Sequence, residues 1–288
     1  MILGIDPKID YAFKRLFGLD RNRDILIDLL HAVLEPADPI ADVEILNPFN
    51  PKETEEDKLS IVDIKVRDQR GRLFNVEMQM VVYPALPKRL LYYWSRVYHQ
   101  QLHEGEDYES LQPTISICFL DDVLFPAVAD HHLQFRLMDA HHGTVLTDDI
   151  QVHLLELRKF RRAERDLASP LDRWLFFLRH AELLDAEALP AVLTGPAIQR
   201  AVKELRMITQ NDRERELYEA REKQRRDEVS RLNAAKRAGY KDGLVERVQM
   251  CQRILQQNPS PDAELQKLSV DDLKALAARL EQELASKQ

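Results

Sequence analysis

Apolar and polar residues alternate with a period of two in two neighbouring stretches of this chain, residues 62–66 and 74–80. Such alternation predicts two strands, each with one apolar face and one polar face. The apolar positions are Val62, Ile64 and Val66 in the first stretch, and Phe74, Val76, Met78 and Met80 in the second. The polar face of this predicted hairpin therefore carries the charged and amide side chains that lie between them.

The segment between the two predicted strands suits a three-residue hairpin loop over Gln69–Gly71. Glycine at the third loop position can take the left-handed conformation that such a loop requires. A loop centred on Arg70 places Asp63 directly opposite Glu77 on the polar face. Like charges in such a pair are destabilising because their Cβ atoms lie about 4.5–5.5 Å apart. A divalent cation shared by the two carboxylates would account for this arrangement.

Helical periodicity of apolar residues predicts most of the remaining elements. We expect helices at residues 7–17, 23–34, 88–102, 172–180, 185–193 and 198–208, and a solvated, charged helix at 211–240. A final helix should begin at the capping box Ser269–Asp272. Further strands are expected at residues 43–46, at 113–120 and within 145–157, and an acidic loop at 47–58.

The charge of the chain is unevenly distributed, which leaves a nucleic-acid partner open despite a net charge of −8. Residues 1–154 hold 15 Lys and Arg against 26 Asp and Glu, whereas residues 155–242 hold 20 against 16. Nonspecific DNA affinity comes from the neutralisation of phosphates. Any DNA contact should therefore draw on local basic patches.

Targeting and redox signals favour a cytoplasmic protein without a membrane partner. The first residues carry charges too early for a secretory signal peptide. No apolar run approaches the roughly 18 residues of a membrane span. The two cysteines, Cys118 and Cys251, form neither a disulfide framework nor a metal-ligand spacing.

An Asp and a Glu that face each other on adjacent strands form a hard oxygen site, which suits Mg²⁺ or Mn²⁺. Such a cation activates water and polarises a phosphoryl oxygen. Gln79 follows Glu77 by two residues and so shares its face, and Asp10 would add a third carboxylate if its helix packs beside the hairpin. The alternative is a solvated polar face on which Lys65 and Arg67 neutralise the acids.

Two other groups of residues each allow two hypotheses. The helix expected at residues 88–102 mixes Arg89 with several aromatic residues. Such a mixture grips phosphates and bases, but it is also typical of a helix that packs in the core. The histidine pairs at 131–132 and 141–142 lie near aspartates, so they form either a metal site or a solvated polar loop.

A series of short motifs runs in order through the first half of the chain. It comprises Asp10-Tyr-Ala-Phe13-Lys14-Arg-Leu-Phe17-Gly18, Asn47-Pro48, Asp63-Ile-Lys65, Gly71-Arg72, Glu77-Met-Gln79, Arg89-Leu-Leu-Tyr92-Tyr93 and Gln101-Leu-x-x-Gly105-x-x-Tyr108, followed by the apolar strand Thr114–Leu120. This series resembles the PD-(D/E)xK nuclease family transposases, also called recombination-promoting nucleases. The resemblance is close over roughly residues 5–160.

The resemblance implies an α/β fold (α+β, with a mixed sheet) that has a restriction-endonuclease-like core and a helical C-terminal region. We expect the nuclease-like core at residues 1–160, a helical extension at 161–210, a charged helix or linker at 211–242 and a C-terminal helical segment at 243–288. The core should bear a Mg²⁺-dependent site that cuts DNA phosphodiesters.

The resemblance also assigns roles to individual residues. Asp63 and Glu77 would bind the metal, with the backbone carbonyl of Met78 as a further ligand. Gln79 takes the place of the Lys in the superfamily's (D/E)-x-K motif, and Asp10 matches the acid of the N-terminal helix. The residues expected to contact DNA are Lys14, Lys65 and Arg89.

We therefore expect a Mg²⁺- or Mn²⁺-dependent DNA endonuclease of a recombination system or mobile element, with a homodimer as one option for its assembly. The alternative is a catalytically weak or inactive module of the same fold that binds DNA or protein partners through its helical tail. The net acidity and the missing Lys favour this alternative. A coiled-coil oligomeriser over residues 198–240 is a third hypothesis, which the thin apolar stripe there weakens.

Overall fold

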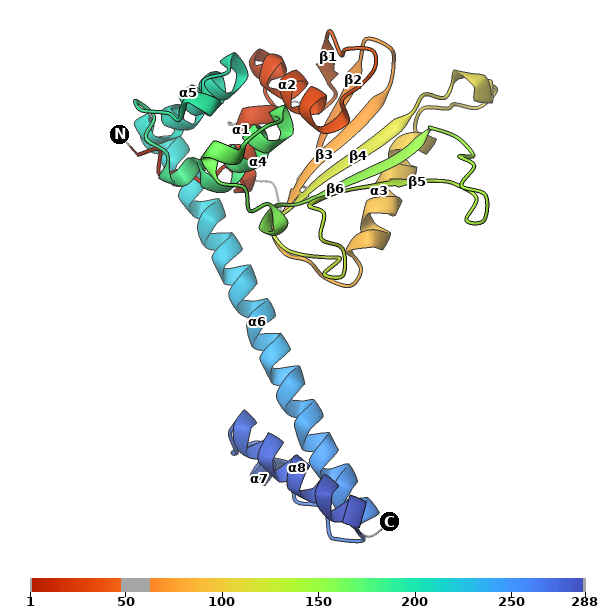
Figure 1. Cartoon of the computed structure of the whole chain (residues 1–288), viewed down its shortest axis with the longest axis vertical. Coiled ribbons are helices and arrows are strands. Elements are labelled where there is room, and N and C mark those ends of the chain that lie inside the picture. The colour runs from red at the N-terminus through yellow and green to blue at the C-terminus, as the bar shows by residue number, and fades with distance from the viewer. Residues whose placement is uncertain (1, 48–62, 287–288) are drawn as a thin grey trace. The chain divides into compact units, whose positions relative to one another are not determined.

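The computed structural model describes residues 2–47 and 63–286, with only the backbone of Asp63. Six strands form one mixed sheet in the order β1-β2-β3-β4-β6-β5 (Figure 1). Strands β1 to β3 are antiparallel neighbours, β3, β4 and β6 run parallel, and β5 is antiparallel to β6. The strand bounds are β1 Val43–Ile45, β2 Asp63–Asp68, β3 Leu73–Gln79, β4 Thr114–Leu120, β5 His132–Arg136 and β6 Ile150–Glu156. The expected α/β fold with a mixed sheet is confirmed.

The β2–β3 hairpin has the register that its sequence predicts. Asp63 pairs with Glu77, and Arg67 pairs with Leu73. Gly71 has a φ of 84°, the left-handed conformation expected of the third loop residue. The loop is closed by a 3.0 Å hydrogen bond from the Gly71 N–H to the carbonyl oxygen of the last β2 residue. The acidic loop expected at 47–58 lies, apart from its first residue, outside the described part of the chain.

Helices cover both faces of the sheet. Their bounds are α1 Asp10–Phe17, α2 Arg23–Leu34, α3 Leu86–His99, α4 Pro170–His180, α5 Pro196–Gln210, α6 Asp212–Ile254, α7 Asp262–Leu265 and α8 Val270–Ser286. Apolar residues of α1, α2, α4 and α5 share one buried cluster with one sheet face. Leu86 and Leu90 of α3 pack with Cys118 and Leu154 on the opposite face. Figure 1 accordingly shows α3 on the far side of the sheet from α1, α2 and α4.

The structure differs from the expected elements in three places. The charged helix expected at 211–240 begins at Asp212 and continues to Ile254. The helix expected at 185–193 is wrong: this region holds the short 3₁₀ turn Ala191–Leu193, preceded by extended backbone. Pro190 directly precedes that turn and has no N–H to donate in a helix. The region between β4 and β6, expected to be a loop, contains the strand β5. Local periodicity does not determine the conformation of either of the last two regions, which depends on proline and on tertiary neighbours.

The chain separates into two compact units, residues 1–222 and 223–288. The first unit contains the sheet, and residues of α4 and α5 belong to the same hydrophobic cluster as α1 and α2. The second unit has its own cluster, in which Val248 of α6 packs with Leu265, Leu273 and Leu280 of the final helices. The capping box expected at Ser269 is present, since its hydroxyl accepts a 3.1 Å hydrogen bond from the N–H of Asp272. The four-part division of the chain stays a prediction.

A buried arginine ties α1 to the helices that follow the sheet. Arg15 is only 2% exposed, and its guanidinium lies 2.7 Å from the carboxylate of Glu214 and 3.5 Å from that of Glu204. Buried charges are stable only when they are paired in this way.

Among the described residues, no helix is both long and apolar enough to cross a lipid bilayer. The expected cytoplasmic location stays a prediction.

Candidate active site at the carboxyl edge of the sheet

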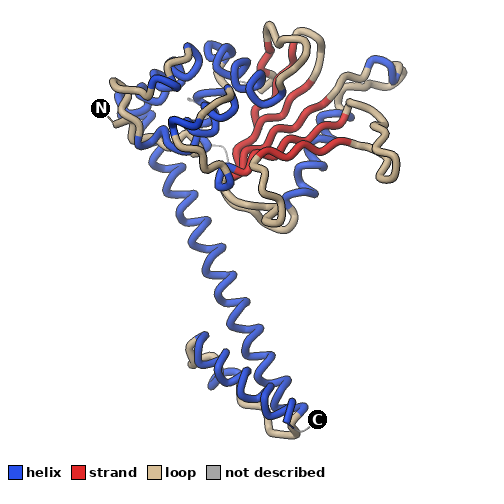
Figure 2. Tube along the Cα trace, in the orientation of Figure 1, coloured by secondary structure: helices blue, strands red, loops and turns tan. Residues whose placement is uncertain are grey.

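The three parallel strands end together at one edge of the sheet. Gln79 of β3 is in register with Leu120 of β4, and Leu120 is in register with Glu156 of β6. The loops that follow these strands therefore begin at the same edge (Figure 2). Ligands of open α/β sheets bind outside the carboxyl ends of parallel strands. The expected site residues of β3 lie at this edge.

Glu77 is a buried carboxylate two residues before the end of β3. The residue is 1% exposed and is in register with Cys118, which faces α3. Its partner in the hairpin is Asp63, so the backbone brings two acidic residues to directly opposed positions. A carboxylate so deeply buried needs a cation or several hydrogen bonds to stay charged. One guanidinium nitrogen of Arg89 lies 3.9 Å from the Glu77 carboxylate.

Arg89 of α3 links Gln79 to this buried carboxylate. Its guanidinium donates a 2.8 Å hydrogen bond to the Tyr83 hydroxyl and a 3.3 Å hydrogen bond to the Gln79 side-chain oxygen. It also lies over the ring of Tyr93, 5.5 Å from the ring centroid. The Gln79 amide nitrogen donates a 2.8 Å hydrogen bond to the carbonyl of Val81. Among the residues that the structure describes, no further acceptor binds the second N–H of that amide.

The positive charge of Arg89 persists despite its partial burial. Burial opposes the charged form, but the hydrogen bond to Tyr83 and the charge of Glu77 together raise the pKa of Arg89 above its ordinary value. A guanidinium is charged at every physiological pH even without such help. A permanent cation therefore lies beside Gln79, the residue that takes the place of the lysine in the (D/E)-x-K motif.

Helix α3 is held in place from its other end. The Trp94 indole N–H donates a 2.7 Å hydrogen bond to the carbonyl of Thr114, at the start of β4. The Tyr98 hydroxyl donates one of 2.7 Å to the Asp149 carboxylate, and burial together with this bond raises the pKa of Tyr98 to about 12. Tyr92, by contrast, is 63% exposed. The aromatic residues of this helix therefore divide between packing against β4 and an exposed outer face.

The remaining residues from the motif series occupy different faces. The Met78 side chain lies in the cluster on the α1 face, so its backbone carbonyl is the group that it can offer to a metal. Lys65 is half-buried and follows Asp63 by two residues, which puts it on the face of Glu77. Asp10 begins α1, and its carboxylate lies 3.4 Å from Lys14. The body of α1 packs on the opposite sheet face. The functional roles of these four residues stay predictions.

The histidine pairs have separate environments. His132 lies in β5, and its Nε2 is 3.0 Å from Nδ1 of the buried His153 in β6. The expected solvated loop is therefore wrong for this pair. His142 is exposed and contacts Asp139 at 2.7 Å, as expected of a polar loop. Within the described residues, no three His, Cys, Asp or Glu side chains are grouped as a metal site.

Acid should destabilise the fold through His153. Burial first, and then the charges of His132 and Arg136, lower the pKa of His153 from 6.5 to about 4. The unfolded chain therefore binds this proton more readily, and stability falls as the pH drops from about 6.5 towards 4. We expect a loss of about 2 kcal/mol between pH 7 and pH 5 from this group. Urea unfolding of the wild type and of His153→Gln at both pH values measures it, with the exposed His142→Gln as the control. Equal losses in all three proteins would contradict this expectation.

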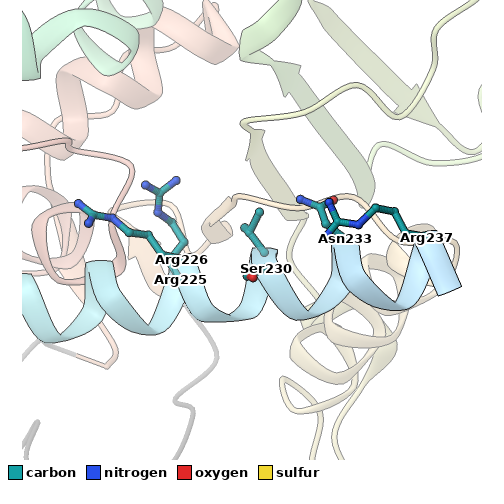
Figure 3. Close-up of a pocket in the computed structure, with 6 residues that line it drawn as sticks. Arg225, Arg226, Ser230, Asn233 and Arg237 are labelled. Carbon is teal, nitrogen blue, oxygen red and sulfur yellow. The ribbon is translucent and has the colours of Figure 1, made fainter. Parts of the chain in front are cut away.

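A basic surface lies on α6. A shallow depression on this helix is lined by Arg225, Arg226, Val229, Ser230, Asn233 and Arg237. Figure 3 shows the labelled side chains along one side of the helix. The described residues of this lining include three guanidinium groups and no carboxylate, which is the composition of a surface that attracts anions.

The family of the chain follows from its match to a family model. Residues 7–235, most of the chain, match the model of the PD-(D/E)XK nuclease family transposase. The chain belongs to this family. No curated protein and no solved structure was found to match it. PD-(D/E)XK nucleases generally use divalent metals.

The residues at the carboxyl edge fit the small, oxygen-preferring cation that PD-(D/E)XK nucleases use. The β2–β3 register opposes two acidic residues, and an amide side chain follows on the same face. Asn75 and Ser116, buried on that face, have side-chain oxygens without a hydrogen-bond partner among the described residues. Such buried oxygens call for water or an ion. The donor set therefore suits Mg²⁺ or Mn²⁺.

Sequence patterns missed several residues of this edge. Tyr83, which contacts Arg89, lies in the segment between β3 and α3. This segment has no periodicity that would reveal the contact. A run of basic residues from Arg158 to Arg165 directly follows β6. Its density of charge was the available signal, but only the register of the strands shows that this run starts at the sheet edge where β3 ends.

Proposed function

We propose that this protein is a Mg²⁺- or Mn²⁺-dependent DNA endonuclease that acts in recombination or in a mobile element. One observation carries the proposal: a PD-(D/E)XK family chain opposes Asp63 and Glu77 in register at the carboxyl edge of its sheet. Acidic residues at directly opposed register positions, one of them buried, are unfavourable without a cation. The family supports a nuclease; the metal dependence and the residues that carry it are part of the proposal.

In this mechanism each side chain at the edge has one role. Asp63 and Glu77 hold the cation, with the Met78 carbonyl as a further ligand. When bound, the cation supplies Lewis-acid activation of water and of the phosphodiester. The free N–H of Gln79 holds the attacking water or a phosphate oxygen, because its other polar groups are engaged by Arg89 and Val81.

The remaining predicted residues would support this chemistry around the edge. Asp10 supplies a further carboxylate, and Lys14 and Lys65 contact DNA phosphates. Arg89 restores, from helix α3, a positive charge that Gln79 lacks. A fixed cation beside the reacting phosphate stabilises the charge that develops in the transition state.

The experiment that tests the proposal is nicking of supercoiled plasmid by the full-length protein. Parallel reactions contain Mg²⁺, Mn²⁺ or EDTA. We expect conversion to open-circle or linear DNA with either metal and none with EDTA. Folded protein that leaves the plasmid intact under all three conditions would overturn the nuclease.

Replacing Arg89 should slow cleavage without abolishing it. We expect Arg89→Gln to lower the nicking rate by about 10- to 100-fold, because it removes the fixed cation beside Gln79 and Glu77. Arg89→Lys should recover part of the rate, since the charge remains although the guanidinium contacts are lost. The control is Arg96→Gln, an exposed arginine on the same helix. Equal rates for Arg89→Gln and the wild type would contradict the role of Arg89.

A second candidate function is a nuclease-fold module that binds DNA or a protein through its helical tail. The three arginines along one side of α6 favour it (Figure 3). The two candidates differ in their response to metal, since a ligand that binds only the folded protein raises its Tm. A Tm that rises with Mg²⁺ supports the nuclease, whereas an unchanged Tm together with tight DNA binding supports the module.

The homodimer expected from the sequence stays a prediction. The mass measured by size-exclusion chromatography would test it.

A further inference from the structure

A basic depression lies where the chain leaves β6 and enters α4. Arg161, Arg162, Ala163, Phe176, Arg179 and His180 line it. The first three come from the segment that follows the 3₁₀ turn Leu157–Lys159, and the last three come from one face of α4 near its end. Three guanidinium groups thus converge on one depression of the first unit, and none of the described residues that line it is a carboxylate.

The positions of these arginines are set by the surrounding structure. The Arg179 guanidinium donates to the carbonyl of Phe160, a residue that is 1% exposed. Arg162 pairs with the buried carboxylate of Asp172. Asp172 also accepts hydrogen bonds from the N–H groups of Ala168 (2.9 Å) and Ser169 (3.0 Å), the residues just before α4. These contacts anchor the segment against the helix, so the depression is built into the fold.

Among the described residues, acids balance only part of the charge of the depression. Asp172 neutralises Arg162, but Arg161 and Arg179 make no ion pair with any acidic side chain that the structure describes. Burial, and then the positive charges of Arg179 and Lys8, lower the pKa of His180. The positive charges of Arg179 and Lys8, which contribute less to this shift than burial does, also favour an anion.

Helix geometry does not by itself explain this cluster. Cations are stabilised at the C-terminal end of a helix, which accounts for Arg179 and His180 in the last turn of α4. Arg161 and Arg162 are not part of a helix, so the dipole gives no reason for their presence. A guanidinium fork that lacks a carboxylate partner matches the geometry of a phosphate group.

The topology of the sheet places this segment at the edge that carries the candidate active site. Gln79, Leu120 and Glu156 are in register, and the basic segment begins two residues after Glu156. Two strand spacings separate β3 from β6, a distance of about 10 Å. A DNA strand that is bound at Gln79 and runs across this edge would bring neighbouring phosphates to the start of this segment.

We propose that Arg161, Arg162 and Arg179 form a phosphate-binding site for the DNA backbone, a few nucleotides from the scissile phosphodiester. The site rests on the proposed function for the identity of its substrate. It holds DNA through charge and the guanidinium fork, independently of base sequence. Its occupant is the phosphodiester of a DNA strand that crosses the carboxyl edge of the sheet.

The test is DNA binding without catalysis. Fluorescence anisotropy of a labelled duplex is measured with the full-length protein in EDTA, at salt concentrations from about 50 to 200 mM. Arg161→Gln removes an exposed side chain, so its Tm should equal that of the wild type. We expect this variant to bind about tenfold more weakly, with a slope of log affinity against log salt that is smaller by about 1. Arg161→Glu should weaken binding further.

The matched control is Arg165→Gln, which removes the same charge four residues later. Arg165 is 88% exposed, pairs with its neighbour Asp166 at 3.8 Å and lies outside the depression. We expect its salt slope to equal that of the wild type. An unchanged slope in Arg161→Gln, or an equal change in both variants, would overturn the site. A merely structural role of Arg161 would change the Tm and leave the slope as it was.

Two further outcomes separate this site from the nuclease itself. Metal-dependent nicking together with an unchanged slope in Arg161→Gln overturns the phosphate site and leaves the endonuclease standing. DNA binding with the expected slope change, but without nicking in any metal, supports the phosphate site and overturns the endonuclease. An RNA duplex of the same length is the last comparison, and a slope change confined to RNA overturns the assignment to DNA.

Discussion

Plasmid nicking should fall by about a thousandfold or more in Asp63→Ala, to the background seen with EDTA. The variant loses one of the two opposed acids that we propose hold the cation, and no other acid of the hairpin takes the register position opposite Glu77. Without metal, its Tm should equal or exceed that of the wild type, because the repulsion between facing carboxylates is gone. With Mg²⁺ added, the rise in Tm expected of the wild type should be missing.

The matched control for this experiment is Glu44→Ala. Glu44 lies on β1, next to the hairpin, and its 62% exposed side chain contacts Arg67 at 3.7 Å. It removes a carboxylate from the same sheet at little cost, because exposed ion pairs contribute at most about 1 kcal/mol. Its nicking rate should match the wild type. Nicking that survives in Asp63→Ala at the wild-type rate would remove Asp63 from the site.

Loss of the buried guanidinium in Arg15→Met should destabilise the first unit by about 3–5 kcal/mol, because Glu214 loses its cation and, among the described residues, Glu204 keeps only the exposed Arg21 at 2.9 Å. The carboxylates belong to Glu204 of α5 and to Glu214 in the first turn of α6. For a unit of this size, the loss corresponds to a fall in Tm of about 6–20 °C. Thermal unfolding followed by circular dichroism and urea titration measure the two quantities.

Two further variants separate charge from packing in this experiment. Arg200→Met removes an exposed guanidinium that lies 2.9 Å from Asp24 and should cost no more than about 1 kcal/mol. Adding Glu204→Gln and Glu214→Gln to Arg15→Met should recover part of the lost stability, since neutral amides are less costly to bury than carboxylates. If the triple variant is no more stable than Arg15→Met, the loss comes from packing, and the charge explanation fails.

Local pattern was sufficient for the β2–β3 hairpin. The alternation over residues 74–80 depends on side chains that point to opposite faces in turn, and the glycine of the loop depends on a single backbone conformation. Both are properties of a few consecutive residues. They predict the Asp63–Glu77 pairing without any knowledge of the rest of the molecule, and the observed register confirms it.

Strand β5 and the region 185–193 could not be predicted in the same way. Strand β5 contains His132 and Arg136 and is stabilised by backbone pairing with β6, a partner 14 residues or more along the chain. The helix wrongly expected at 185–193 has apolar residues at suitable intervals, but Pro190 and the neighbouring packing give 3₁₀ turns instead. For β5 the decisive contact is distant in sequence. For residues 185–193, a proline and the neighbouring packing override the helical periodicity.

The sequence alone determined the family, the mixed α/β character and the opposed acids of the hairpin, because these follow from short-range pattern and ordered motifs. Only the tertiary structure decided which charged groups surround the opposed acids. Arg89 reaches Gln79 because α3 is anchored along β4, with its first turns beside the end of β3. The arginines after β6 reach the same edge because three parallel strands end in register. Side chains from distant segments meet only when the sheet has formed, so no local pattern encodes their meeting.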